Sequence, residues 1–311
     1  MSSLFIIGNG FDLAHGLPTK YSNFRSFLEK EYEADEDIIL FPPEITMGNH
    51  GEEDPNSAEV ASLVTHLLLN ANVGKDWCDF EEKLGQLDYD EFYDHIEDFS
   101  SDEEENFFIT AYKMEDVTSS LLKSIPYIQE LFREWIDTIL INPKLLQRQP
   151  FKSLCVPEKD AFLNFNYTLT LEKLYNCKNV CHIHGKQGQS ILVGHGDDTD
   201  EAGCFDNTQF PGAICNLTDV KRALRKDTNN ALQNNHKFFE SLSTVDKIYS
   251  IGFSFNSVDM VYIQEICRQI DSDKVVWTFN NHGLDEKELE SIKNSIRKYG
   301  YTGKFEIKKI I

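Results

Sequence analysis

The chain has 311 residues, of which 41% are hydrophobic and 26% charged, so it can form one large or two smaller folded domains and is not expected to be disordered, collagen-like or a coiled coil. Its 30 basic and 52 acidic side chains give a net charge of −22. A chain this negative repels phosphate groups, and no dense block of Lys and Arg offsets the charge, so we expect no nucleic-acid partner.

No stretch approaches the roughly 18 apolar residues needed to span a bilayer, and residues 1–10 lack the features of a secretion signal. We therefore expect a cytoplasmic protein with no membrane partner. The seven cysteines are scattered and odd in number, as expected for free thiols in a reducing compartment. The nearest pair, Cys177 and Cys181, precedes His182 and His184, but no second cysteine pair supports zinc binding, and we expect no metal site.

The first predicted element is a strand at residues 3–7, a short apolar run that ends at a glycine. A glycine turn containing Gly8 and Gly10 follows it. Residues 21–32 then carry apolar and aromatic side chains at helical spacing, with Ser22 as a candidate cap. The chain therefore begins with a buried strand, a tight turn and a helix.

The next part of the chain predicts a mainly helical region. The Pro-, Gly- and acid-rich residues 42–55 favour a loop or an insertion. Helical patterns follow at residues 58–69, 77–87 and 107–141. The last of these is broken near Pro126, and the many carboxylates of residues 88–105 favour a solvated acidic face or a mobile loop. We expect residues 21–150 to form a helical insertion.

The second half alternates short strands with helices. Strands are predicted at residues 160–166, 178–184, 190–194, 246–252, 273–279 and 304–311, and helices at 169–175, 230–242, 258–270 and 285–299. Several strands are apolar throughout, as expected when both faces of a sheet are covered. This alternation predicts an α/β fold with a mostly parallel, doubly wound Rossmann-like sheet, built from residues 1–20 and 151–311.

In open α/β sheets, ligands bind beyond the carboxyl ends of the strands, so the residues that follow each predicted strand are the candidate site. These residues are Gly8, Asn9, Gly10, Phe11, Asp12, Asn166, Tyr167, His184, His195, Ser254, Asn256 and Asp259. Two interpretations of the first turn stay open. Gly8 and Gly10 can let a diphosphate approach the backbone, or they form a tight turn in which Asp12 caps a helix. The third glycine of a dinucleotide fingerprint is replaced by Leu13.

His184 is the best candidate for acid–base chemistry, because the ordinary pKa of histidine is near neutral and this residue ends a predicted strand. One of His182 and His184 can equally be a core histidine bonded to a carbonyl. Asn166 suits a ribose hydroxyl, a carboxamide or a water, or forms an Asx turn. The basic residues Lys221, Arg222, Arg225 and Lys226 favour a surface helix or loop.

Several segments together resemble the AbiH family of bacterial abortive-infection proteins, in the same order and over most of the chain. They are IIGNGFDLAHGLPTKYSNF, WCDFE, FLNFNYTLTLE, HIHG and GFSFNSVD. At a greater distance they are similar to sirtuins and to the sirtuin-like NAD-cleaving effectors of phage defence. In that comparison the family's glycine loop is matched by Gly8, Gly10, Gly16, Leu17 and Pro18. A second motif is matched by Asn164, Asn166, Tyr167, Leu171 and Glu172, and His184 matches the catalytic histidine.

The resemblance implies a sirtuin-like core that binds NAD. Asn166 would lie by the nicotinamide ribose, and His184 would polarise a ribose hydroxyl or a water. Cofactor binding would involve Gly8, Asn9, Gly10, Phe11, Asp12, Tyr167, Gly252, Ser254 and Asp259, of which the glycines and Ser254 hold the diphosphate and adenosine side. Asp12 and Thr168 depart from the sirtuin pattern, and no zinc module is present, so protein deacylation is not expected. Asp12 can instead bind a ribose hydroxyl or a magnesium ion.

The leading hypothesis is an antiphage effector that hydrolyses NAD to nicotinamide and ADP-ribose. The first alternative is a nucleotide sensor without turnover, and the second is an interaction protein that engages a phage component. The resemblance also admits a homo-oligomer and a phage trigger as partners, and the sequence decides neither.

Overall fold

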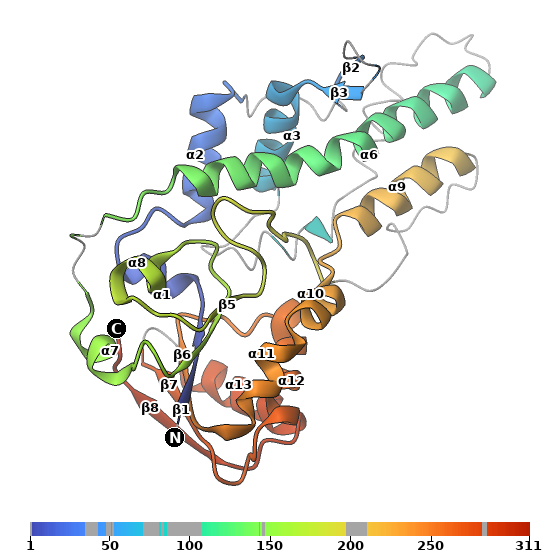
Figure 1. The fold of residues 1–311 in the computed structure, drawn as a ribbon. Helices are drawn as coiled ribbons and strands as arrows, with labels where there is room; N and C mark the ends of the chain where they lie inside the picture. Colours follow the sequence, from blue (N-terminus) through green and yellow to red (C-terminus); the bar gives the residue numbers. More distant parts are fainter. Residues whose placement is uncertain are drawn as a thin grey trace. The chain divides into compact units, whose positions relative to one another are not determined.

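A computed structural model describes residues 2–34, 43–47, 51, 53–70, 81, 84–85, 107–142, 144, 147–196, 210–281 and 285–311 (Figure 1). The chain forms two compact units. The sheet unit comprises Met1–Thr19, Ile136–Leu192 and Asp227–Ile311, and the helical unit comprises Lys20–Trp135 and Val193–Lys226. That residues 1–20 and 151–311 form the core and residues 21–150 an insertion domain stays a prediction.

The sheet unit contains a six-stranded parallel sheet in the order β5-β4-β1-β6-β7-β8. Its strands are β1 (Ser2–Ile7), β4 (Ala161–Asn164), β5 (Val180–His182), β6 (Val245–Ile251), β7 (Val276–Asn280) and β8 (Lys304–Lys308). The chain builds outward from β1 to β4 and β5, then returns to place β6 on the other side of β1. The predicted doubly wound parallel sheet is confirmed.

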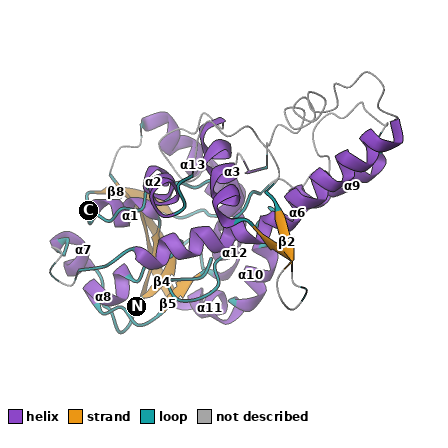
Figure 2. Cartoon of the chain, turned by 90° about the horizontal axis from the view of Figure 1, so that it is seen from above, coloured by secondary structure: helices purple, strands orange, loops and turns teal. Residues whose placement is uncertain are grey.

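Helices cover both faces of this sheet (Figure 2). They are α1 (Asn9–Ala14), α7 (Gln149–Leu154), α8 (Thr170–Tyr175), α10 (Thr228–Asn234), α11 (His236–Glu240), α12 (Met260–Gln269) and α13 (Glu286–Lys298), with short 3-10 turns at Ser241–Thr244 and Ser257–Asp259. Side chains alternate along β1, so Leu4 and Ile6 join the core with α11, α12 and α13. Phe5 points to the other face, where its ring lies 5.1 Å from Phe162 and 5.5 Å from Phe151.

The helical unit is built mainly from helices. It contains α2 (Tyr21–Glu31), α3 (Ser57–Asn70), α9 (Pro211–Ala223), most of α6 (Phe107–Thr138) and a hairpin of β2 (Ile45–Met47) and β3 (Glu53–Pro55). Phe24 of α2 packs on Phe132 and Trp135 of α6, with ring centroids 5.2 and 5.3 Å apart. Residues 42–55, predicted as a loop or an insertion, thus include the β2–β3 hairpin.

Two predictions about elements are wrong. Helix α6 continues through Pro126 instead of breaking there. Proline removes one backbone hydrogen bond, but the buried side chains of Leu121, Ile125 and Ile128 stabilise the helix before and after it. Residues 190–194 form no strand; Ile191 makes only an isolated antiparallel bridge with Gly185. The expected helix at 77–87 and the acidic stretch 88–105 lie almost entirely outside the described residues. Within the described part of the chain, no helix has the length and hydropathy needed to cross a membrane.

The sequence predicted that the basic residues near the end of α9 lie on a surface helix or loop. This prediction is wrong for two of them. Lys221 and Lys226 are buried, and Lys226 Nζ lies 2.8 and 3.0 Å from the two carboxylate oxygens of Glu81. The side chains of Lys226 and Glu81 are only 1% and 12% exposed. Burial of the ammonium group is therefore tolerated because a carboxylate neutralises it.

We expect Glu81→Gln to lower the free energy of unfolding by about 3–5 kcal/mol, because it leaves the buried Lys226 ammonium without its counter-charge. Urea denaturation measures this. The double variant Glu81→Gln, Lys226→Met removes both charges and should recover much of the loss. Equal destabilisation by the single and double variants would contradict the expected role of the ion pair.

Candidate functional site

The site lies where the strand order of the sheet reverses, between β1 and β6. The strand register aligns the carboxyl ends of β5, β4, β1 and β6 in one row. The last residue of each strand pairs with the last residue of the next, in the order His182, Asn164, Ile7 and Ile251. The residues that follow these strands therefore gather at one edge. In open α/β sheets this switch point is where ligands bind.

Two glycine turns meet at this edge, backbone against backbone. A Cβ on Gly8 would lie 2.5 Å from the Gly252 carbonyl oxygen, and a Cβ on Gly10 would lie 2.7 Å from the Gly252 Cα. The Gly8 amide donates to the Ile251 carbonyl (3.1 Å), and the Gly10 amide donates to the Gly252 carbonyl (3.0 Å). The glycines thus have a packing role, and two of their amides are engaged within the protein.

The residues between these glycines and Asp12 have structural partners. Asn9 Nδ2 donates to the Thr19 carbonyl at 2.9 Å, and Phe11 lies in the aromatic core beside Phe151 (4.9 Å between ring centroids). Gly8 is the N-cap of α1, and Asp12 lies within that helix. The prediction that Asp12 caps a helix is therefore wrong.

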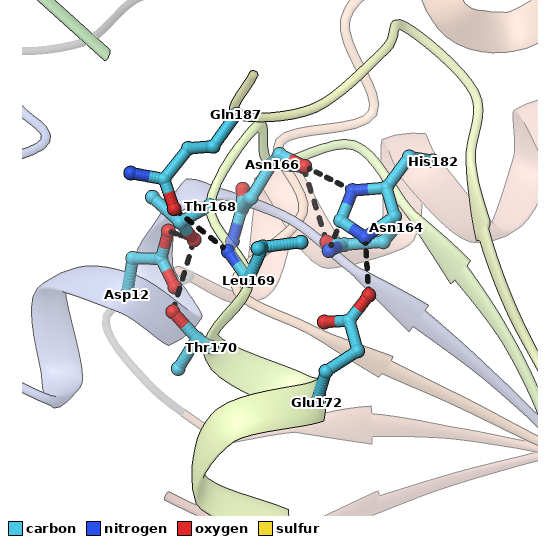
Figure 3. Close-up of polar contacts among 9 residues, drawn as sticks. All are labelled: Asp12, Asn164, Asn166, Thr168, Leu169, Thr170, Glu172, His182 and Gln187. Atoms are coloured by element: carbon cyan, nitrogen blue, oxygen red, sulfur yellow. Dashed lines mark hydrogen bonds and ion pairs between the residues drawn. The ribbon is translucent and has the colours of Figure 1, made fainter. Parts of the chain in front are cut away.

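Asp12 is a buried carboxylate, 1% exposed, with polar groups around it (Figure 3). Thr168 Oγ1 donates to Asp12 Oδ2 at 2.5 Å and lies 2.9 Å from Thr170 Oγ1, whereas Asp12 Oδ1 has no hydrogen-bond partner. Burial raises the pKa of Asp12 to about 6, against the opposing effects of Thr168, Thr170, Asn166 and the nearby His182. The sequence marked Thr168 only as a departure from the sirtuin pattern and carried no signal for Thr170.

Asn166 is held on three sides. Its Nδ2 donates to the Gly8 carbonyl (3.1 Å), its backbone amide donates to Asn164 Oδ1 (3.1 Å), and its backbone carbonyl lies 3.1 Å from His182 Nδ1. The Asx-type bond two residues onward is therefore made by Asn164, which the sequence marked only as part of the sirtuin resemblance. Asn166 itself joins the β4 loop to the first glycine turn.

His182 pairs with Glu172 of α8, which Figure 3 shows below the ring. Its Nε2 lies 2.7 Å from Glu172 Oε1, while Nδ1 faces the Asn166 carbonyl. The Asn164 side-chain amide also lies 3.5 Å from Nδ1, so the ring links α8, the β4 loop and β4 itself. This pairing spans ten residues of sequence, and only the β4–β5 register and the start of α8 bring it about.

Gln187 holds the same loop from the other end. Its Oε1 accepts from the Leu169 amide (3.3 Å), its backbone amide donates to the Tyr167 carbonyl (2.8 Å), and its Nε2 donates to the carbonyls of Ile136 and Ile139 at 2.9 and 2.8 Å. The loop that carries Asn166 and Thr168 is thereby fixed at both ends. Sequence analysis gave Gln187 no role.

His184 lies in a different set of contacts. The residue is 3% exposed, and its Nε2 lies 3.2 Å from the Tyr262 hydroxyl and 3.4 Å from Asp259 Oδ1. The rings of Phe165 and Tyr262 are each 5.4 Å from the imidazole. Asp259, predicted to bind the cofactor, thus faces the predicted base.

The other predicted site residues are placed as follows. Tyr167 donates its hydroxyl to the Leu192 carbonyl (3.0 Å), and Ser254 is exposed after the Gly252 turn. His195 lies in the helical unit, and its Nε2 is 2.9 Å from the Lys221 backbone carbonyl oxygen. The strand predicted at residues 190–194 does not form, so His195 does not follow a strand end. Within the described ranges, no three His, Cys, Asp or Glu side chains are grouped to hold a metal ion.

A family model described as "Bacteriophage abortive infection AbiH" matches residues 4–281, which run from β1 to the end of β7. The chain belongs to the AbiH family. AbiH membership places it among the proteins of phage abortive infection, as the resemblance in the sequence indicated. No curated protein and no solved structure matches this AbiH chain, so its similarity to sirtuins stays a prediction.

Proposed function

We propose that this AbiH protein acts in abortive infection by binding NAD at the switch point and hydrolysing it to nicotinamide and ADP-ribose. The observation that carries the proposal is that Asp12 and Asn166, both buried, follow β1 and β4 at the carboxyl edge of a doubly wound sheet. His184, also buried, follows β5 and has separate contacts with Tyr262 and Asp259. Buried polar and ionisable groups at a switch point are typical of a ligand site. Loss of NAD would halt an infected cell and the phage within it.

The proposed reaction breaks the bond between the nicotinamide nitrogen and the anomeric carbon of its ribose. Water bonds to that carbon, and the electrons of the broken bond pass to the nicotinamide ring and cancel its positive charge. His184 takes the proton that the water releases, and Asp259, 3.4 Å from its Nε2, stabilises the resulting imidazolium ion. Asn166 orients the ribose or the water.

The contacts of the diphosphate are a separate part of the proposal. The amides of Gly8 and Gly10 already donate to carbonyls at the end of β6. Diphosphate binding by Gly8, Gly10, Gly252 and Ser254 is supported only by the sirtuin resemblance. The ribose and nicotinamide side is therefore the part that the geometry of the polar cluster supports best.

The test is release of nicotinamide from NAD by the purified chain, beside Asn166→Ala and His184→Ala. Removing a general base lowers a rate by about 10²–10⁴-fold, so His184→Ala should lose most of the release. Asn166→Ala should also lower it, because the ribose or the water loses the group that orients it. His236→Ala, at an exposed histidine of α11, is the control and should retain it. Unchanged release by His184→Ala would contradict the assigned role.

A nucleotide sensor is the second candidate, and the near-complete burial of His184 favours it. Titration calorimetry with NAD separates the two. Binding without release of nicotinamide would support the sensor, whereas neither binding nor release would leave a role in interaction with a phage component.

A further inference from the structure

We infer that residues 252–256, between β6 and the 3-10 turn at Ser257–Asp259, form a gate loop that is closed over His184 in this structure and opens to expose the imidazole. The inference goes beyond the proposed function, because it concerns access to His184 and does not depend on which ligand that side chain meets.

The first observation is the enclosure of His184. The residue is 3% exposed, and the rings of Phe165 and Tyr262 each lie 5.4 Å from the imidazole. Asp259 Oδ1 and the Tyr262 hydroxyl lie 3.4 and 3.2 Å from Nε2. A general base must come within hydrogen-bond distance of the proton that it removes. One or more of these three neighbours must therefore move before the imidazole meets a ligand.

The second observation is that two of the three neighbours depend on the gate loop. The Phe253 ring lies 4.3 Å from the Phe165 ring, so the loop packs directly on Phe165. Asp259 ends the 3-10 turn that follows the loop, and the Asn256 side chain caps this turn. Tyr262, by contrast, is fully buried within α12 in the core of the sheet unit. Movement of the loop therefore displaces Phe165 and Asp259 without displacing Tyr262.

The third observation is backbone strain within the gate loop. Phe255 has φ +57, in the left-handed region that a bulky L-residue rarely adopts. Its ring lies 4.8 Å from the Phe253 ring and 5.8 Å from the Phe279 ring. Strained residues persist only where surrounding contacts hold them, and they cluster at switch regions and ligand clamps. The aromatic contacts of Phe255 thus hold the loop closed against a strain that opening relieves.

The fourth observation is how the gate loop is attached. Within the described part of the chain, the backbone groups of residues 253–255 make no hydrogen bond with another backbone group. Gly252 is the fixed end, because its carbonyl accepts from the Gly10 amide (3.0 Å). At the other end the Asn256 carbonyl accepts from the Asp259 amide (3.0 Å), so the 3-10 turn moves with the loop. Local opening costs the contacts that it breaks, and here these are contacts between side chains.

The experiment measures access to His184 with diethyl pyrocarbonate. A carbonyl carbon of the reagent bonds to a ring nitrogen, ethyl carbonate leaves and the ring proton passes to water, so only an imidazole that the reagent reaches is labelled. Tandem mass spectrometry assigns the label to single histidines. Phe255→Ala and Phe255→Gly both remove the ring, but only glycine removes the strain of the left-handed backbone. His184 should therefore be labelled about fivefold faster, or more, in Phe255→Ala than in Phe255→Gly.

The labelling of the wild-type chain in urea separates gate opening from unfolding. If His184 is exposed only by unfolding, the logarithm of its labelling rate rises with urea with the slope of the equilibrium unfolding. The gate predicts a much shallower slope below the unfolding transition, because opening exposes little new surface. His236, exposed on α11, is labelled in the closed and open forms alike and corrects for the activity of the reagent.

Two results would overturn the gate. One is an equal rate of His184 labelling in Phe255→Ala and Phe255→Gly, and the other is labelling that follows the slope of equilibrium unfolding. Neither measurement uses NAD, so the outcome is independent of the test of hydrolysis. A chain that releases nicotinamide but gives either of these results would keep the proposed function and lose the gate. A chain that passes both and releases no nicotinamide would keep the gate and lose the proposed hydrolysis.

Discussion

Replacing Gly252 with alanine is expected to lower the free energy of unfolding by about 4 kcal/mol or more. Gly252 has φ +64, and a Cβ there would lie 2.3 Å from the Phe11 nitrogen and 2.6 Å from the Gly10 carbonyl carbon. Both obstacles are backbone atoms of the first turn of α1, which cannot rotate away as a flexible side chain can. The substitution must therefore separate the two turns that meet at the switch point.

Gly188 provides a matched control for this substitution. It has φ +75, similar to that of Gly252, but a Cβ there meets nothing within 4 Å. Gly188→Ala should therefore show only the cost of the left-handed backbone, about 1 kcal/mol. Urea denaturation measures both variants. Similar losses for Gly188→Ala and Gly252→Ala would show that backbone strain, and not the contact between the turns, sets the requirement for glycine.

The second large effect is a dependence of stability on pH that comes from Asp12. Burial raises its pKa from 3.8 to about 6, so the folded chain binds a proton more tightly than the unfolded chain does. Stability from this group is greatest below pH 3.8 and is lost as pH rises through 6. With about 1.4 kcal/mol for each pH unit between the two pKa values, the loss is about 3 kcal/mol.

Comparison with Asp12→Asn isolates this effect. The free energy of unfolding of the variant minus that of the wild type should rise by about 2.5 kcal/mol between pH 4 and pH 7.5, most of the full effect. Any constant effect of the amide cancels in this difference. Asp116→Asn, whose carboxylate is exposed on α6, should show no comparable rise. A difference for Asp12→Asn that does not vary with pH would contradict a desolvated carboxylate at this position.

Much of the sheet could be predicted from local sequence. Its buried strands are continuous apolar runs that end at glycine or at polar residues, and such runs suit strands covered on both faces. The position of the candidate site followed from the same pattern, because parallel strands bring their carboxyl ends to one edge. Asp12, Asn166 and Asp259 were singled out in this way, whereas Gly252 was named only through the sirtuin resemblance.

The errors have physical causes that local patterns do not contain. The break expected at Pro126 does not occur, because packing on both sides outweighs the loss of one backbone bond. Residues 190–194 have the composition of a strand, but Leu192 instead donates its amide to the His184 carbonyl and accepts from the Tyr167 hydroxyl. Lys226 has the charge of a surface residue and is buried against Glu81, 145 positions earlier.

By itself, the sequence determined the alternation of strands and helices, the family and the edge at which polar residues collect, since each depends on short-range patterns or on motifs in order. Only the tertiary structure decided the partners within that edge. It pairs His182 with Glu172, leaves one oxygen of Asp12 without a donor and commits the Gly8 and Gly10 amides to β6. These outcomes depend on strand register and on the close approach of two turns, to which residues more than 150 positions apart contribute.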